Sequence, residues 1–305
     1  MKRLLLILVA VFAVTPLRAQ QVALTFDDLP EHGDLPPHIT RQQIARSILT
    51  VLKREKMPPI YGFVNAISFK DAPEEISFLK AWRAAGQPLG NHTYSHASLT
   101  ADTVAQYETE IARDEPVLKR MMANQDWRWF RYPYLSEGDT LEKRDAIRSY
   151  LQQKGYKIAQ VSLDFKDYLW NDPYVRCAEK RNTKEMELME QGYLAAADQA
   201  ITVFREGTHA LYGRDIPYVL LLHVGALDAK MLPRLIALFR QRGFTFVTLP
   251  EAMSDPAYRE NPNVALADGV PFQEQVAISR HVTFPHIEDR AKELDAVCPE
   301  RRRLP

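Results

Sequence analysis

Two short polar motifs in this sequence carry residues that could do chemistry together. Asp27 and Asp28 directly follow the apolar run 22–24, and His92 and His96 lie four residues apart after another short apolar stretch. Because buried strands read as short apolar runs, we expect both motifs where a strand ends. One carboxylate and two imidazoles suit a divalent ion such as Zn²⁺ and leave a coordination position open. A second carboxylate is then spare, and a free base beside a metal site can serve hydrolysis.

Each motif alone has an ordinary explanation. Acidic pairs often solvate a turn at a strand end, and two histidines spaced i, i+4 often share a helix face. The two motifs together favour a metal site. The residue types alone leave open which of the two aspartates is the ligand and which is the base.

Composition indicates an ordinary globular protein. Of 305 residues, 46% are hydrophobic and 26% are charged, which argues against disorder. The formal net charge is zero, so nothing suggests a nucleic-acid partner. The length suits a single α/β barrel or two smaller domains.

The first nineteen residues resemble a signal peptide. A positive start at Lys2-Arg3 precedes an apolar core at 4–14, and residues 17–19 resemble a cleavage site before Gln20. We therefore expect residues 1–19 to be removed and the mature protein to be periplasmic or extracellular, without stable membrane insertion. A retained membrane anchor is the alternative, although the apolar run is short for a bilayer.

The sequence contains two cysteines, Cys177 and Cys298. Export to an oxidising compartment would allow them to form a disulfide that ties the tail to the middle of the chain. Two unpaired buried thiols are the alternative. Neither cysteine has a metal-ligand spacing with the histidines.

Apolar runs alternate with helix-like segments, which predicts a mostly parallel sheet with crossover helices. Strands are expected at 22–26, 60–64, 127–130, 158–163, 218–222 and 244–247, with 89–91 leading into the histidine motif. Helices are expected at 39–56, 73–85, 103–122, 141–154 and 229–242. The candidate residues follow the carboxyl ends of strands, where barrel enzymes carry their active sites.

Two regions depart from this alternation. In the stretch 171–215, one or two helices are expected over 186–204, either shaping the rim of a substrate groove or packing on the barrel wall. We expect a catalytic barrel over 20–252. The rest, 253–305, should be a loosely structured extension that packs on the barrel, with one short helix at 287–296.

These features together resemble the polysaccharide deacetylase family, the metal-dependent carbohydrate esterases that include chitin, chitooligosaccharide and peptidoglycan deacetylases. The resemblance runs from about residue 21 to 252, and five ordered motifs carry it: 25–28, 92–96, 131–134, 164–168 and 220–223. It implies an α/β fold, an irregular barrel of about seven strands. It also implies one divalent metal ion, with Zn²⁺ as first choice and Co²⁺, Ni²⁺ or Mn²⁺ as alternatives.

The resemblance assigns roles to the residues of the first two motifs. Asp28, His92 and His96 would be the metal ligands. Asp27 would be the general base, since a base must lie near the attacking water without being coordinated itself. The alternative role for Asp27 is to orient a ligand.

The later motifs would supply charge and protons. Arg131 beside Asp27 would keep that carboxylate ionised, although a solvated arginine at a strand end is the ordinary alternative. Asp167 would fix Arg131, and Asp164 is a competing candidate for that role. His223 would be the general acid that protonates the leaving amine, although a lone histidine at a strand end is otherwise often a core residue.

Four residues would contact the substrate. The Tyr134 backbone N–H would donate to the oxyanion, and Leu222 would line the pocket for the acyl methyl group. Tyr168 stands where the family commonly has tryptophan, and Trp170 comes two residues later, so either ring could line the groove.

The resulting prediction is an exported hydrolase that removes acetyl groups from N-acetylated or O-acetylated sugars of a polysaccharide or oligosaccharide. A catalytically idle carbohydrate-binding protein on the same fold is one alternative, and a small-molecule amidase or esterase is another. The oligomeric state is left open. Five further histidines are expected outside the site: His32, His38, His209, His281 and His286.

Overall fold

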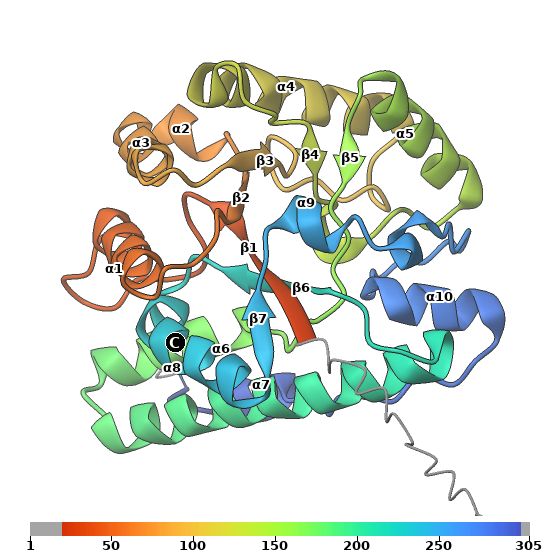
Figure 1. The fold of residues 1–305 in the computed structure, drawn as a ribbon. Helices are drawn as coiled ribbons and strands as arrows, with labels where there is room; N and C mark the ends of the chain where they lie inside the picture. Colours follow the sequence, from red (N-terminus) through yellow and green to blue (C-terminus); the bar gives the residue numbers. More distant parts are fainter. Residues whose placement is uncertain (1–19, 300–305) are drawn as a thin grey trace, which may run out of the picture.

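The computed structural model describes residues 20–299, so the expected signal peptide lies outside the described residues. Seven parallel strands form one sheet in the order β5-β4-β3-β2-β1-β6, with β7 paired to β1 (Figure 1). The strands are β1 (Gln20–Leu29), β2 (Tyr61–Val64), β3 (Leu89–Asn91), β4 (Trp129–Phe130), β5 (Lys157–Ile158), β6 (Tyr218–His223) and β7 (Phe244–Phe246). This confirms the predicted α/β class and strand number.

The sheet curls into an irregular barrel. The Ala159 N–H donates to the Phe130 carbonyl at the β4 side, and Leu163 forms a parallel bridge with Leu220 of β6. The segment that follows β5 therefore joins the two edges of the curled sheet. This segment was expected to be one continuous strand, but its pairing switches from one neighbour to the other along its length.

Strand alternation in β1 separates the outside of the barrel from its inside. Leu24 and Phe26 pack in the large core under the surrounding helices, whereas Ala23 belongs to a smaller inner cluster. Thr25 and Asp27 share the parity of Ala23 and so point inward. The inner face of β1 therefore ends in a carboxylate at the carboxyl edge of the sheet.

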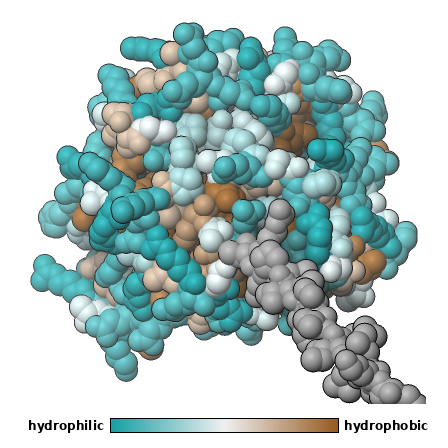
Figure 2. Space-filling view, viewed as in Figure 1, coloured by the Kyte–Doolittle hydropathy of each residue, from teal (hydrophilic) through white to brown (hydrophobic). Residues whose placement is uncertain are grey.

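Helices surround the sheet (Figure 1). They are α1 (Arg41–Arg54), α2 (Ser68–Asp71), α3 (Ile76–Ala84), α4 (Val104–Met122), α5 (Leu141–Gln153), α6 (Tyr168–Glu179), α7 (Thr183–Tyr212), α8 (Ala226–Gln241), α9 (Leu249–Ala252), α10 (Phe272–Arg280) and α11 (Ala291–Asp295). Hydrophilic residues cover most of the face shown in Figure 2, with smaller apolar areas between them. No helix among residues 20–299 combines the length and apolar character needed to cross a membrane.

Helix α1 illustrates how local sequence sets an element. The Thr40 side chain accepts the Gln43 N–H in a capping box, which satisfies backbone donors at the start of the helix. Ile44, Ile48 and Leu52 then recur on one face and are buried in the large core. The apolar stripe predicted from the sequence is thus the packing face.

The two irregular regions contain more helix than expected. The stretch after Asp167 forms α6 and the 30-residue α7, which pack on each other and on α8. The expectation of a loosely structured tail was wrong over α10, where the Phe272 N–H donates to the Val161 carbonyl and the buried Gln273 amide donates to Ser162. These contacts hold the tail against the segment after β5.

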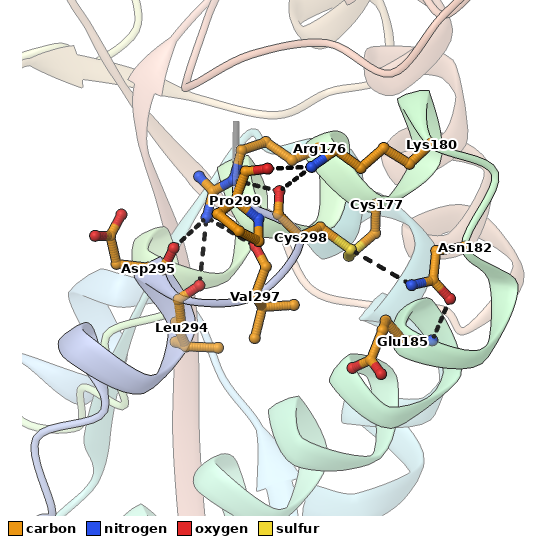
Figure 3. The surroundings of a disulfide bond; sticks show 10 residues. All are labelled: Arg176, Cys177, Lys180, Asn182, Glu185, Leu294, Asp295, Val297, Cys298 and Pro299. Carbon is orange, nitrogen blue, oxygen red and sulfur yellow. Dashed lines mark hydrogen bonds between the residues drawn. A yellow bond between two sulfur atoms is a disulfide. The ribbon is translucent and has the colours of Figure 1, made fainter. Parts of the chain in front are cut away.

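A disulfide joins Cys177 on α6 to Cys298 in the tail, with the Cα atoms 5.3 Å apart (Figure 3). Of the two alternatives drawn from the sequence, the disulfide is confirmed. The neighbouring Arg176 donates to the carbonyls of Leu294 and Val297. The hydrogen bonds of Arg176 and the disulfide therefore hold the same tail segment. Both interactions tie the end of the described chain to α6.

We expect reduction of this disulfide to destabilise the protein. The bond joins residues 121 positions apart, and closing a long loop restricts the unfolded chain, which is worth about 2–4 kcal/mol. Denaturant unfolding with and without a reductant measures the difference, and a Cys177→Ala/Cys298→Ala variant serves as the control that reductant should not affect. Identical unfolding midpoints for oxidised and reduced wild type would contradict the expectation.

Candidate active site and metal centre

Asp28, His92 and His96 meet at the carboxyl edge of the sheet in an arrangement that fits a divalent metal ion. Asp28 Oδ1 lies 3.5 Å from His92 Nε2 and 3.4 Å from His96 Nε2. Ligand atoms about 2.1 Å from a tetrahedral ion lie about 3.4 Å from one another. Asp28 Oδ1 is also buried without a hydrogen-bond partner among the described residues. An ion bound here would satisfy that oxygen.

The protonation states of these side chains suit metal binding. Burial lowers the pKa of His92 to about 4, and burial together with the charge of His92 lowers the pKa of His96 to about 4. Both imidazoles are therefore neutral at neutral pH, as metal ligation requires. The His92 Nδ1–H donates to the Arg131 carbonyl at 2.8 Å, which leaves Nε2 free to face the site.

The loops that carry the ligands adopt backbone conformations held by buried amides. Asp28, Thr93 and His96 all have positive φ, at 62°, 62° and 56°. Such left-handed backbone costs a non-glycine residue of order 1–2 kcal/mol. The Asn91 side chain accepts the Thr93 N–H, and the Asn65 amide donates to the carbonyls of His92 and Thr93. These buried bonds hold the backbone at His92 and Thr93 and so help to offset the strain there.

Asp27 lies beside the ligand set. It is 2% exposed, and its Oδ2 is 3.6 Å from His92 Nε2. The Arg131 guanidinium donates to Asp27 Oδ2 at 3.3 Å. Burial raises the pKa of Asp27, and the positive charge of Arg131 opposes that rise. The carboxylate is thus fixed in direction and raised in basicity, as a general base requires.

Arg131 is held by groups other than the one expected. Its Nε donates to the Ala159 carbonyl at 2.7 Å, its Nη2 donates to Thr25 Oγ1 at 3.1 Å, and its guanidinium lies 4.7 Å from the centre of the Phe63 ring. Among the described residues, Asp167 makes no hydrogen bond with Arg131. The expectation that Asp167 fixes Arg131 was therefore wrong.

Asp167 instead binds His223. Its Oδ1 is 2.9 Å from His223 Nδ1, and its Oδ2 accepts the His223 backbone N–H at 2.6 Å. The physical reason is its position: Asp167 directly precedes α6, and its side chain makes no capping hydrogen bond to that helix but reaches His223 at the end of β6. The alternative, Asp164, acts on Arg131 through its charge, which opposes the lowering of the Arg131 pKa by burial.

Two further buried residues, Asp228 and Tyr193, lie close to Asp167. No sequence motif indicated them. Asp228 of α8 accepts the Tyr193 hydroxyl of α7 at 2.6 Å, and, in addition to burial, the nearby charge of Asp167 helps to raise the pKa of Asp228. Burial raises the pKa of Asp167 to about 7 and that of Asp228 well above its usual range. His223 is therefore backed by a buried polar chain that links α6, α7 and α8.

His32 was expected outside the site, and this expectation was wrong. Its Nδ1 lies 2.9 Å from Asp28 Oδ2, and its ring stacks on His223 with centroids 4.4 Å apart. The signal that could have found it is its i, i+4 spacing from Asp28, the same spacing as between the two histidine ligands. The other four histidines, His38, His209, His281 and His286, are exposed.

Two tyrosines flank the site. Tyr134 is 59% exposed, and its ring meets the His96 ring edge-on with centroids 4.4 Å apart. Tyr168 is 41% exposed at the start of α6 and meets His223 edge-on at 5.7 Å. No residue among 20–299 accepts a hydrogen bond from the Tyr134 backbone N–H. The rings therefore border the metal centre on the His96 side and on the His223 side.

Two residues expected in the groove lie in the core instead. Leu222 is 1% exposed and packs with the helices, because neighbouring side chains of a strand point to opposite faces and His223 takes the inner one. Leu221, at the Cα position paired with Thr25, shares the inner face. Trp170 is 3% exposed and packs against Tyr193 between α6 and α7.

The fold and the site define a barrel protein with an Asp-His-His centre at the carboxyl ends of its strands. A family profile described as polysaccharide deacetylase matches residues 15–159. A peptidoglycan-N-acetylglucosamine deacetylase from Bacillus cereus is 28% identical over 153 residues, which cover 50% of this chain and 48% of that protein. The chain spans about half or less of the length of two curated relatives that it matches.

Solved structures share the fold. The chitin deacetylase of Colletotrichum lindemuthianum aligns with a TM-score of 0.52 at 22% identity, covering 78% of this chain and 90% of that one. A CE4 family pseudoenzyme from Bacillus anthracis aligns with a TM-score of 0.53 at 16% identity, covering 77% and 66%. Residues 15–159 of this chain thus match the polysaccharide deacetylase family, and the curated relatives include chitin and peptidoglycan deacetylases.

The geometry of the metal centre leads to a binding prediction. His92→Ala and His96→Ala should each abolish stoichiometric metal binding, because each removes one of only three protein ligands. Metal content of the purified variants, measured by elemental analysis after loading with Zn²⁺, checks this. His286→Ala, which removes an exposed histidine, should keep full occupancy. Full metal content in the His92→Ala/His96→Ala double variant would contradict the ligand set.

Proposed function

We propose that this protein is a metal-dependent deacetylase that hydrolyses acetyl groups on N-acetylated or O-acetylated sugars of a polysaccharide or oligosaccharide. The observation that carries the proposal is the register between β1 and β6, in which Asp27 pairs with His223. This register sets a buried carboxylate and a buried imidazole side by side, next to the Asp28, His92 and His96 centre. A base and an acid beside a metal site are the groups that amide hydrolysis needs.

The chain divides the chemistry among these residues. A divalent ion held by Asp28, His92 and His96 would supply a Lewis acid for the acyl carbonyl, with Zn²⁺ as first choice and Co²⁺, Ni²⁺ or Mn²⁺ as alternatives. Asp27, held by Arg131, accepts a proton from the attacking water. His223, held at Nδ1 by Asp167, presents Nε2 and donates a proton to the leaving amine or alcohol. Acetate and the free amine or alcohol are the products.

The remaining residues position the substrate. The Tyr134 backbone N–H would donate to the developing oxyanion, where a fixed donor is worth most. The exposed rings of Tyr134 and Tyr168 can pack against the faces of a sugar on two sides of the reacting group. Leu221, on the inner face of β6, takes the place first expected for Leu222 beside the acyl methyl group.

An exported location accords with the disulfide, since such bonds persist in oxidising compartments. Two other functions remain to be tested against the proposed one. The pseudoenzyme among the structural neighbours shows that the fold also exists without activity. In this chain the residues proposed as base, acid and metal ligands lie close together, which supports an enzyme. A small-molecule amidase or esterase is the other alternative.

An acetate-release screen tests the proposal. The Zn²⁺-loaded protein should release acetate from at least one of chitooligosaccharides, acetylated peptidoglycan and acetylated exopolysaccharide, and a chelator should stop the release. Release only from small N-acetyl amines would favour the amidase. No release from any substrate by the metal-loaded protein would favour the idle carbohydrate-binding protein.

Asp27→Asn should separate catalysis from metal binding. The amide is nearly the same size but cannot take a proton, so we expect activity to fall roughly 10²–10⁴-fold with full metal content. Asp28→Asn is the matched variant and should weaken the metal itself. Acetate release and metal titration on both variants check this, and wild-type turnover by Asp27→Asn would refute its role as base.

His223→Ala should lower activity in a way that depends on the leaving group. An acid must be protonated to act, so activity should fall as pH rises on the alkaline side, and the variant should lose this limb of the pH profile. The loss should be roughly 10²–10⁴-fold for an N-acetyl amine. The loss of activity should be smaller for an aryl acetate, because its aryl oxide leaving group departs without needing a proton. Equal losses on both substrates would indicate a structural role for His223.

A further inference from the structure

We infer that His32 is a positioning residue for the metal centre: it holds one oxygen of Asp28 so that the other faces the two histidine ligands. The inference rests on the metal site of the proposed function and on no particular substrate. It concerns the one histidine near the centre that no motif assigns.

The two oxygens of Asp28 face different partners. Oδ1 lies 3.4–3.5 Å from the Nε2 atoms of His96 and His92, a spacing that suits two ligands of one ion. Oδ2 lies 2.9 Å from His32 Nδ1, which is the length of a direct hydrogen bond. An ionised carboxylate can only accept, so His32 Nδ1 carries the proton and donates it. This bond sets the rotation of the Asp28 carboxylate.

The far side of His32 is also held. Its ring stacks on the His223 ring with centroids 4.4 Å apart and planes inclined by 37°. Only 16% of the His32 side chain is exposed. The ring therefore lies between a metal ligand at the end of β1 and the candidate acid at the end of β6. A side chain so enclosed can hold Asp28 in one orientation.

The backbone around His32 is anchored from two helices. Arg41, the first residue of α1, donates to the carbonyls of His32 and Gly33 at 3.0 and 2.6 Å. Asn171 of α6 donates to the Asp34 carbonyl at 3.0 Å. A side chain at Gly33 would meet the Asn171 amide at 2.5 Å, so glycine is needed for this close approach. These contacts hold the loop, and with it His32, in a single conformation.

The alternative to a positioning role is that His32 itself binds the metal ion. Asp28, His32 and His223 also lie close enough together to form a three-ligand group of their own. The direct 2.9 Å bond between His32 and Asp28 favours positioning over ligation, because two ligands of one ion lie farther apart. If His32 were itself a ligand, its removal would change the number of bound ions.

The test is the Zn²⁺ affinity of His32→Ala, measured by competition with a chromophoric chelator. Loss of a residue that orients a ligand typically weakens metal binding about 10–100-fold, and we expect that loss with one ion still bound per chain. His32→Asn should recover most of the affinity, because its side-chain N–H can occupy the place of Nδ1–H. His38→Ala, in the same loop but exposed, should bind like wild type.

The outcomes are separable. Wild-type affinity in His32→Ala, or no recovery by His32→Asn when circular dichroism shows both variants folded, would overturn the inference. A fall in the number of bound ions would overturn it in favour of direct ligation. Because the readout is metal affinity, it is independent of acetate release, so the inference can hold even if no sugar is deacetylated.

Discussion

The parallel pairing of β1 with β6 is the interaction on which the rest of the site depends. It sets Asp27 opposite His223, and the next residue, Asp28, has a left-handed conformation where the register of β1 shifts. Strand alternation then decides which neighbours face inward, so Thr25 reaches Arg131 while Phe26 packs outside. A slip of one residue in this register would exchange the two faces and move Asp27 away from Asp28, His92 and His96.

The second constraint is electrostatic. Three carboxylates lie within or beside the centre, and a buried charge without a partner is costly. Each has its own donor: Arg131 for Asp27, His32 for Asp28 and His223 for Asp167. Because these donors come from different elements, the charges hold loops together as well as preparing the site for chemistry. The same arrangement lets three nearby carboxylates keep different basicities.

The C-terminal extension completes the rim of the site from the end of the chain. The Ser136 hydroxyl donates to the Leu266 carbonyl, next to the loop that carries Tyr134. Gly269 approaches the backbone of Tyr134 and Leu135 so closely that any side chain there would collide with it. Tyr134 has a φ of 58°, a conformation that a non-glycine residue keeps only when its surroundings hold it. The extension is thus part of what supports the loop that carries Tyr134.

The sequence by itself indicated most of the strands and the grouping of Asp28, His92 and His96, because these depend on local patterns. Apolar runs located the strands, and paired residues at strand ends located Asp28, His92 and His96. What only the tertiary structure decided are the contacts made between elements. The partner of Asp167, the burial of Trp170 under α7, the inward face at Leu221 rather than Leu222, and the approach of His32 all follow from how the sheet curls and the helices dock. The curl of the sheet and the docking of the helices depend on packing over the whole core, so they cannot be predicted from any short stretch of sequence.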